Sequence, residues 1–284
     1  MQHLSSTNKQ FPESLKTIGT PPKELYIEGN LEPLLKRPRL AVIGSRKATP
    51  YGRAVTEQLV RGIAARGVVI VSGLAIGVDS IAHQATLEVH GQTIAVLPSG
   101  LDSIYPSSHY SLAKRIVKQN GVLVTEYPPK TTAFSSNFIA RNRLIAGLSA
   151  AVLITEAAEK SGSLHTANFA LEQGKDVLVV PGPITSPTSA GCNNLIKAGA
   201  TPVTCVSDVL NALKVQLPIL AETEVAADSQ EEFAILAQLK EGINDGDDLL
   251  AKSGLGATVF QQTLSMLEIT GRIENVGGNK WVIR

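Results

Sequence analysis

The sequence predicts an α/β protein with a Rossmann-like, doubly wound, mostly parallel sheet, followed by a small C-terminal winged-helix domain. Short apolar runs, helix-period segments between them and a change of pattern after residue 214 support this prediction. Continuous apolar runs are typical of strands buried on both faces. They lie at 40–43, 68–71, 93–97, 122–124, 151–154, 177–180 and 202–206. Strands that alternate strictly with helices form a parallel sheet.

The segment between the first two runs has the period of a helix. Val55, Leu59 and Ile63 share one face of a predicted helix over 53–66, and Gly67 closes its end. In parallel sheets, ligands bind outside the carboxyl ends of the strands. We therefore expect the functional residues in the loops that directly follow the strands.

Four segments are expected along the chain. Residues 1–20 are polar and lack periodicity, so we predict a loosely ordered N-terminal stub. The Rossmann-like domain is predicted over 21–213, and an acidic linker with Pro218 over 214–229. The winged-helix domain should occupy 230–284.

The C-terminal segment has the pattern of three short helices and a terminal hairpin. The helices are expected over 231–240, 245–252 and 257–269, the last with Val259, Leu264 and Leu267 as core contacts. Residues 273–283 then form the hairpin, with glycines at its turn. This arrangement is a winged helix.

Composition narrows the class of protein. The 284 residues are 43% hydrophobic and 18% charged, which permits a large core. Cys192 and Cys205 lack disulfide-framework or zinc-site spacing, so no metal is expected. The chain lacks a signal peptide and an apolar stretch of about 18 residues, which predicts a cytoplasmic protein without a membrane partner.

Charge is distributed unevenly between the two predicted domains. Residues 1–230 carry 21 basic and 17 acidic side chains, whereas residues 231–284 carry 5 and 8. Nucleic acid, if bound, is therefore expected on the first domain.

Two loops near the start of the sheet contain small and polar residues. The loop after the first strand has Ser45, Arg46 and Lys47 behind a glycine, a combination suited to phosphate. The loop after the second strand ends in Asp79, a predicted N-cap. Neither loop contains GxGxxG, and the second strand does not end in an acidic residue, so no dinucleotide cofactor is expected.

Two later loops add cations, hydroxyls and an aromatic ring. Guanidinium groups pair with phosphates, and an exposed ring stacks bases irrespective of their sequence. The candidates are Phe138, Arg141, Asn142 and Arg143 after the fourth strand, and Lys160, Ser161, Gly162 and Ser163 after the fifth.

Each candidate also has a structural interpretation. Arg141 and Arg143 stand two apart on a helix and face different ways, so one is expected to contact nucleic acid and the other a carboxylate. Phe138 either stacks bases or staples the helix to the core. Asp79 and His83 suit an acid/base pair or metal ligands, but without a third ligand we expect an N-cap and a satisfied histidine.

Taken together, these motifs resemble those of the DNA-processing protein A (DprA or Smf) family over residues 25–210. The resemblance rests on Gly44-Ser-Arg46, 72–79, Gly100-Leu-Asp-Ser-Ile-Tyr-Pro106, 138–149, Ser161-Gly-Ser163, Val180-Pro-Gly182 and 191–200. It implies single-stranded DNA binding, a homodimer, and help in loading RecA-type recombinase on DNA covered by single-strand-binding protein during natural transformation or recombination. It implies that Arg46 holds phosphate, that Phe138 lies at the stacking edge, and that Arg141, Arg143, Lys160 and Lys175 line the groove.

The family resemblance leaves some points open. His165 departs from the family pattern and either touches DNA or caps a helix. We expect no catalysis, but two alternatives remain. One is a nucleotide-hydrolysing enzyme that uses Glu156 or Glu159. The other is a winged-helix transcription regulator, whose recognition helix offers Thr258, Gln261 and Gln262 but has no Arg or Lys between 253 and 271.

Overall fold

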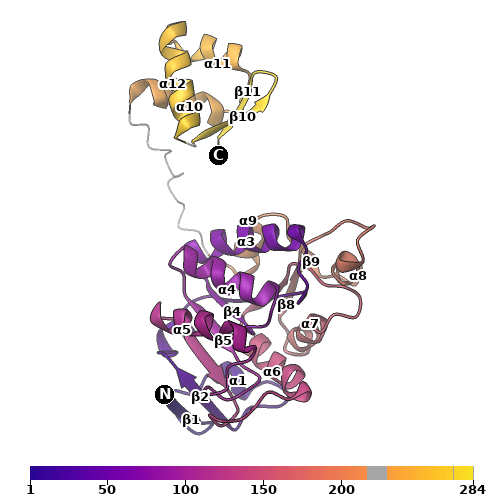
Figure 1. The fold of residues 1–284 in the computed structure, drawn as a ribbon. Helices are drawn as coiled ribbons and strands as arrows, with labels where there is room; N and C mark the ends of the chain where they lie inside the picture. Colours follow the sequence, from indigo (N-terminus) through magenta and orange to yellow (C-terminus); the bar gives the residue numbers. More distant parts are fainter. Residues whose placement is uncertain (216–228, 271, 284) are drawn as a thin grey trace. The chain divides into compact units, whose positions relative to one another are not determined.

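The computed structural model describes residues 1–215, 229–270 and 272–283 (Figure 1). The chain divides into two compact units, Met1–Gln216 and Leu217–Arg284. Each unit has an apolar core of its own, so each is described by itself. The linker predicted over 214–229 falls largely on 216–228, which lie outside the described residues.

The described part of the first unit contains a nine-stranded sheet. Its strands are β1 (Gln2–Ser5), β2 (Glu24–Glu28), β3 (Arg39–Ile43), β4 (Val69–Ser72), β5 (Thr93–Val96), β6 (Val122–Thr125), β7 (Ala151–Ile154), β8 (Asp176–Val179) and β9 (Thr201–Pro202). Their order is β1-β2-β6-β5-β4-β3-β7-β8-β9. Neighbours from β6 to β9 are all parallel, which confirms the predicted mostly parallel sheet.

The central strand β3 shows how the sheet is buried. Leu40 pairs with Ile70 of β4 on one side and with Ala151 of β7 on the other. Leu40 and Val42 face one core, whereas the alternate residues of β3 face the opposite core. The short apolar runs are therefore strands covered on both faces, as predicted.

Helices cover both faces of this sheet (Figure 1). One core contains residues of α1 (Glu13–Lys16), α2 (Glu32–Leu35), α6 (Ser135–Leu148), α7 (Ser163–Glu172) and α8 (Ala190–Lys197). The opposite face is covered by α3 (Pro50–Ala65), α4 (Val78–Glu88), α5 (Tyr110–Lys118) and α9 (Val206–Ala212). Two 3₁₀ turns, η1 (Ser107–His109) and η2 (Pro187–Ser189), lie in loops. In the described ranges, no helix is long and apolar enough to cross a membrane.

The N-terminal segment is not the loosely ordered stub predicted for residues 1–20. β1 pairs antiparallel with β2, which pairs antiparallel with β6. Phe11 and Leu15 are 2% and 0% exposed in the same core as α6. Gly147 permits this packing, because a Cβ there would lie 2.6 Å from Leu15 Cδ2. A few apolar anchors in a polar segment give no periodic pattern, which is why the prediction is wrong.

Two predicted boundaries also shift. The strand expected over 202–206 is only Thr201–Pro202, because Cys205 is already the N-cap of α9. The helix predicted from residue 53 begins at Pro50, where Thr49 Oγ1 accepts a hydrogen bond from Gly52 N. Proline suits the first helical position, since its missing N–H has no partner there in any case.

The second unit is a winged helix, as predicted. It contains α10 (Gln230–Lys240), α11 (Gly246–Ser253), α12 (Ala257–Ile269) and the hairpin β10 (Ile273–Gly277) and β11 (Lys280–Ile283). Leu264 and Leu267 are buried as expected, together with Phe260 and Trp281. Val259 is 42% exposed, so its predicted core role is wrong. Phe260 instead completes the apolar stripe of α12, at the i, i+4, i+7 spacing of one helix face.

Candidate nucleic-acid interface

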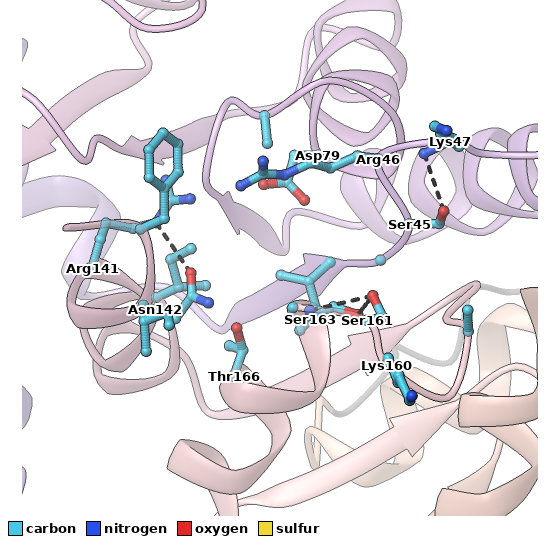
Figure 2. Close-up of a pocket in the computed structure, with 18 of the residues that line it drawn as sticks. Ser45, Arg46, Lys47, Asp79, Arg141, Asn142, Lys160, Ser161, Ser163 and Thr166 are labelled. Carbon is cyan, nitrogen blue, oxygen red and sulfur yellow. Dashed lines mark hydrogen bonds between the residues drawn. The ribbon is translucent and has the colours of Figure 1, made fainter. Parts of the chain in front are cut away.

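A pocket opens at the carboxyl edge of the sheet, where β3 lies between β4 and β7. The strand order reverses at this position, which is the usual ligand site of doubly wound sheets. The pocket has a volume of about 610 Å³, and small-molecule sites measure about 300–1,000 Å³. Its walls come from the loops after β3, β4 and β7 and from α6 and α7 (Figure 2).

Ten of the thirteen predicted site residues line this pocket. They are Ser45, Arg46, Lys47, Phe138, Arg141, Asn142, Lys160, Ser161, Gly162 and Ser163. The structure does not bring Arg143, His165 and Lys175 to the pocket wall.

The loop after β3 packs closely against the loop after β7. A Cβ on Gly44 would lie 2.7 Å from the carbonyl oxygen of Glu156 and 2.7 Å from Val78 Cγ2, so only glycine fits. Ser45 N donates to the same carbonyl oxygen at 2.7 Å, and Ser45 Oγ accepts from Lys47 N at 3.1 Å. The backbone that carries Arg46 and Lys47 is therefore held in place by these hydrogen bonds.

Arg46 and Lys47 are both exposed. Neither forms an ion pair with any residue that the structure describes. Arg46 Cζ lies 5.0 Å from the centroid of the Phe138 ring, a cation–π distance. Lys47 extends from the opposite side of the loop (Figure 2). Both charges are available to an anion.

The start of α7 forms the facing wall of the pocket (Figure 2). Ser161 Oγ and Ser163 Oγ are 2.8 Å apart, and Ser161 Oγ accepts a hydrogen bond from Ser163 N at 3.4 Å. The positive end of a helix dipole attracts anions. Lys160 adds an exposed cation that is free of ion pairs in the described ranges. The pocket is therefore cationic on two sides.

Arg141 lines the pocket, but its guanidinium is mostly engaged by the protein. The side chain is 4% exposed, and Nη1 donates to the carbonyl oxygen of Gly73 at 2.6 Å and to that of Val96. Burial lowers the pKa of Arg141 to about 10, although nearby Asp79 acts in the opposite direction. Arg141 therefore braces the loop after β4 beneath the pocket, and Asn142 Oδ1 accepts from its Nε at 3.3 Å.

Arg143 and Lys175 have structural partners away from the pocket. Arg143 Nη2 lies 2.6 Å from Glu126 Oε2, with both side chains largely buried. Lys175 Nζ donates to the carbonyl oxygens of Ala146 and Gly147 at 2.6 and 3.0 Å, at the end of α6. Burial lowers the pKa of Lys175 to about 8. Helix C-termini favour a cation such as that of Lys175. Both side chains are thus held by contacts away from the pocket wall.

Asp79 and His83 do not form a metal or acid/base site. Asp79 Oδ2 accepts from Gly73 N at 3.1 Å, while Gly77, not Asp79 as predicted, is the N-cap of α4. His83 is fully buried with Nδ1 2.7 Å from Thr93 Oγ1, and burial lowers its pKa to about 3. Among the described residues, no group of three potential metal ligands occurs.

Glu156 ties the pocket loops together. Its carboxylate accepts from Thr49 N at 2.9 Å, from Thr49 Oγ1 at 2.6 Å and from Thr188 Oγ1 at 3.0 Å. The residue is 2% exposed. Its oxygens are therefore occupied by the fold and do not face the open pocket.

Two residues at or near the pocket were not among the predicted site residues. Thr166 lines it one turn into α7. Tyr105 contacts Phe138, with ring centroids 5.3 Å apart and planes at 78°. Tyr105 lies in the loop after β5, at the same edge of the sheet. The expectation that functional residues lie in loops after strands could therefore have identified it.

The fold and the pocket define a class: a Rossmann-like protein with a cationic, aromatic-lined pocket at the strand switch point and a C-terminal winged helix. The chain belongs to the family of DNA recombination-mediator protein A, whose model matches residues 2–214. The model of the DprA winged helix domain matches residues 220–279. The family expected from the sequence motifs is thus confirmed.

Relatives resemble the chain over most of its length. Protein Smf of Escherichia coli is 39% identical over 97% of this chain and 76% of its own. The structure of DNA processing protein A from Streptococcus pneumoniae matches with a TM-score of 0.70 and 40% identity over 74% of this chain and 73% of its own. The Helicobacter pylori protein, whose structure is described as showing a single-stranded DNA binding mode, matches with a TM-score of 0.67 and 36% identity over 75% and 96%.

Proposed function

We propose that this protein binds single-stranded DNA in the pocket at the β3/β7 switch point and assists the loading of a RecA-type recombinase on that strand in the cytoplasm. The contact of Arg46 with Phe138 carries this proposal. A cation for phosphate and a ring for a base meet there in one pocket, which is what a nucleotide requires.

The charges around the pocket suit a phosphate backbone. Arg46 and Lys47 stand on one wall, and Lys160 stands beside the N-terminus of α7 on the other. The DNA site we propose comprises these cations with Ser45, Phe138, Asn142, Ser161, Gly162 and Ser163. Arg141 supports the site from below. Arg143 and Lys175 are left out because they contact Glu126 and the end of α6, and neither lines the pocket.

The pocket favours a single strand over a duplex. Its volume of about 610 Å³ lies in the range of sites that take one small ligand, which suits a single nucleotide. Stacking on Phe138 also requires an exposed base face, which a duplex hides within its stack. The Helicobacter pylori relative, which binds single-stranded DNA, supports this assignment.

The partners follow from the family. We propose a RecA-type recombinase, single-strand-binding protein on the DNA, and a second copy of this chain, since a two-fold dimer is the commonest association of such domains. Membership of a family of recombination mediators supports the recombinase and natural transformation or recombination as the setting.

The enzymatic alternative finds little support at Glu156. A general base must reach the substrate with a free lone pair, but both oxygens of Glu156 accept hydrogen bonds from threonines. Glu159 is exposed and is absent from the pocket wall. Release of base or phosphate from nucleoside monophosphates, abolished by Glu156→Gln, would overturn the non-enzymatic proposal.

The winged helix is proposed to bind a protein partner, not duplex DNA. The exposed face of α12 carries Thr258, Gln261 and Gln262, with Val259, Met266 and Ile269 also exposed. It has no Arg or Lys to neutralise phosphates, and duplex affinity depends strongly on such charges. A role as a transcription regulator is accordingly not favoured.

The proposal is tested by measuring affinity for single-stranded and duplex oligonucleotides of equal length at several salt concentrations. We expect tighter single-strand binding, with log affinity falling against log salt at about −0.7 per phosphate contact. Equal or stronger duplex binding would contradict the proposal.

A further inference from the structure

The Phe138 ring is less free than a simple stacking platform. The guanidinium of Arg46 lies 5.0 Å from its centroid, and the ring of Tyr105 lies 5.3 Å away at 78°. Phe138 itself is partly buried. Tyr105 is 48% exposed, so it is the more accessible ring of the pair.

The loop that carries Tyr105 is held in place by neighbouring backbone. Gly100 N donates to the carbonyl oxygen of Thr131 at 2.8 Å, and Asp102 N donates to that of Pro129 at 2.9 Å. A Cβ on Gly100 would lie 2.2 Å from the same Pro129 oxygen, so the two segments pack at glycine distance. A platform fixed before binding costs less entropy when a ligand arrives.

We propose that Tyr105 is a second base-stacking position, next to the pocket but outside its wall. The bound DNA strand would leave the pocket at Phe138 and continue over Tyr105, which lies in the β5–α5 loop. This inference rests on the proposed function, because it needs a single strand in the pocket. Two rings at 78° cannot stack flat on one base. Phe138 and Tyr105 therefore take neighbouring bases, and the strand turns between them.

Tyr110 is an exposed aromatic side chain that lacks this placement. Tyr110 is 56% exposed, but its ring lies 5.7 Å from Lys114 Nζ on its own helix. Among the described ring contacts, none joins Tyr110 to Phe138. Tyr110 is therefore a matched control, a tyrosine of similar exposure only five residues away.

A competing role for Tyr105 is to hold the Phe138 ring by its edge contact without touching DNA. The two roles differ in which base they affect. A stacking residue has a base of its own, whereas a positioning residue acts only through the base on Phe138. An oligonucleotide that lacks one base separates the two roles.

The experiment scans an abasic nucleotide through a short oligothymidylate of minimal binding length, with the full chain. In the wild type, we expect two neighbouring positions where loss of the base weakens binding at least about fivefold, the lower end of a stacking contribution. Phe138→Ala should lose the penalty at one position and Tyr105→Ala at the other. Tyr105→Phe and Tyr110→Ala should keep both.

A fluorescent variant gives a second measurement. The chain has one tryptophan, Trp281, in the winged helix, so Tyr105→Trp adds a reporter whose emission should be quenched when a base stacks on it. Tyr110→Trp should not be quenched.

The outcomes are distinct. If Tyr105→Ala keeps both penalties, or loses only the one that Phe138→Ala loses, Tyr105 is not a stacking residue. An unquenched Tyr105→Trp that still binds DNA would likewise rule out stacking at this position. If the wild type binds no single strand at all, the proposed function fails first.

Discussion

Arg46 Cζ lies 5.0 Å from the centroid of the Phe138 ring. The two side chains come from the loop after β3 and from α6, segments about ninety residues apart that meet because their strands end at the same sheet edge. In the proposed complex, one contacts phosphate and the other a base. Their contributions should therefore differ in salt dependence, even though the groups touch.

Arg46→Ala should weaken single-strand binding and reduce the salt slope by about one phosphate contact, or 0.7 in log–log units. The exposed guanidinium makes no ion pair with any described residue, so the fold should be unaffected. Fluorescence anisotropy at four or more salt concentrations checks this. An unchanged affinity and slope, with normal folding, would remove the β3 loop from the site.

Phe138→Ala should weaken binding by about 1–3 kcal/mol with little change in salt slope, because a stacked base releases no counterions. The measurement is the same anisotropy series. Phe138→Trp serves as the control and should retain most of the affinity. A slope that falls as much as in Arg46→Ala would show that Phe138 acts by holding the cation.

The sequence was sufficient to predict the parallel part of the sheet, its carboxyl edge and most of the pocket wall. Short apolar runs mark strands, and the loop rule then selects Ser45, Arg46 and the start of α7. The sequence was not sufficient to tell which basic residues face the pocket and which have structural partners. Whether Lys175 faces DNA or the carbonyl oxygens of α6 depends on packing between distant segments, which local pattern does not contain. The antiparallel strands β1 and β2 were missed for the same reason.

Arg143→Met should destabilise the protein and leave single-strand affinity unchanged. Removing the guanidinium leaves Glu126 largely buried without its 2.6 Å partner, and breaking a buried pair costs about 3–5 kcal/mol. Urea unfolding measures the loss. The double variant Arg143→Met, Glu126→Gln should recover part of it, because the unpaired charge is gone. A stable Arg143→Met protein with weakened DNA binding would show that Arg143 contacts DNA, as the family resemblance implies.

His83 should make the protein less stable in acid. Thr93 Oγ1 donates its proton to the carbonyl oxygen of Ile70, so His83 Nδ1 must donate to Thr93. His83 Nε2 is buried with no acceptor among the described residues, which favours the neutral ring. Burial lowers the pKa of His83 from 6.5 to about 3. Between these values the unfolded chain binds the extra proton, so stability falls as the pH drops below 6.5.

The expected loss from this group between pH 7 and pH 5 is about 2 kcal/mol. His83→Asn keeps a donor for Thr93 but does not titrate. It should be less stable than the wild type at pH 7, because a smaller side chain leaves a cavity. Its further loss on going to pH 5 should be smaller by about 2 kcal/mol. Parallel pH profiles of the two proteins would contradict a buried neutral His83.

Truncation after residue 215 should leave single-strand affinity within a few-fold of the full chain. The first unit, Met1–Gln216, has its own core and contains the whole pocket. The deleted residues 216–284 carry 5 basic and 11 acidic side chains, so their removal takes away no net positive charge that attracts phosphate. The salt slope should likewise stay the same, since each lost phosphate contact would lower it by about 0.7.

Thermal unfolding of the truncated chain provides the folding control. A loss of more than about tenfold, or 1.4 kcal/mol, in a protein that remains folded would place part of the DNA site on the winged helix. A reduced slope alongside that loss would identify phosphate contacts there, whereas an unchanged slope would indicate a contact with bases.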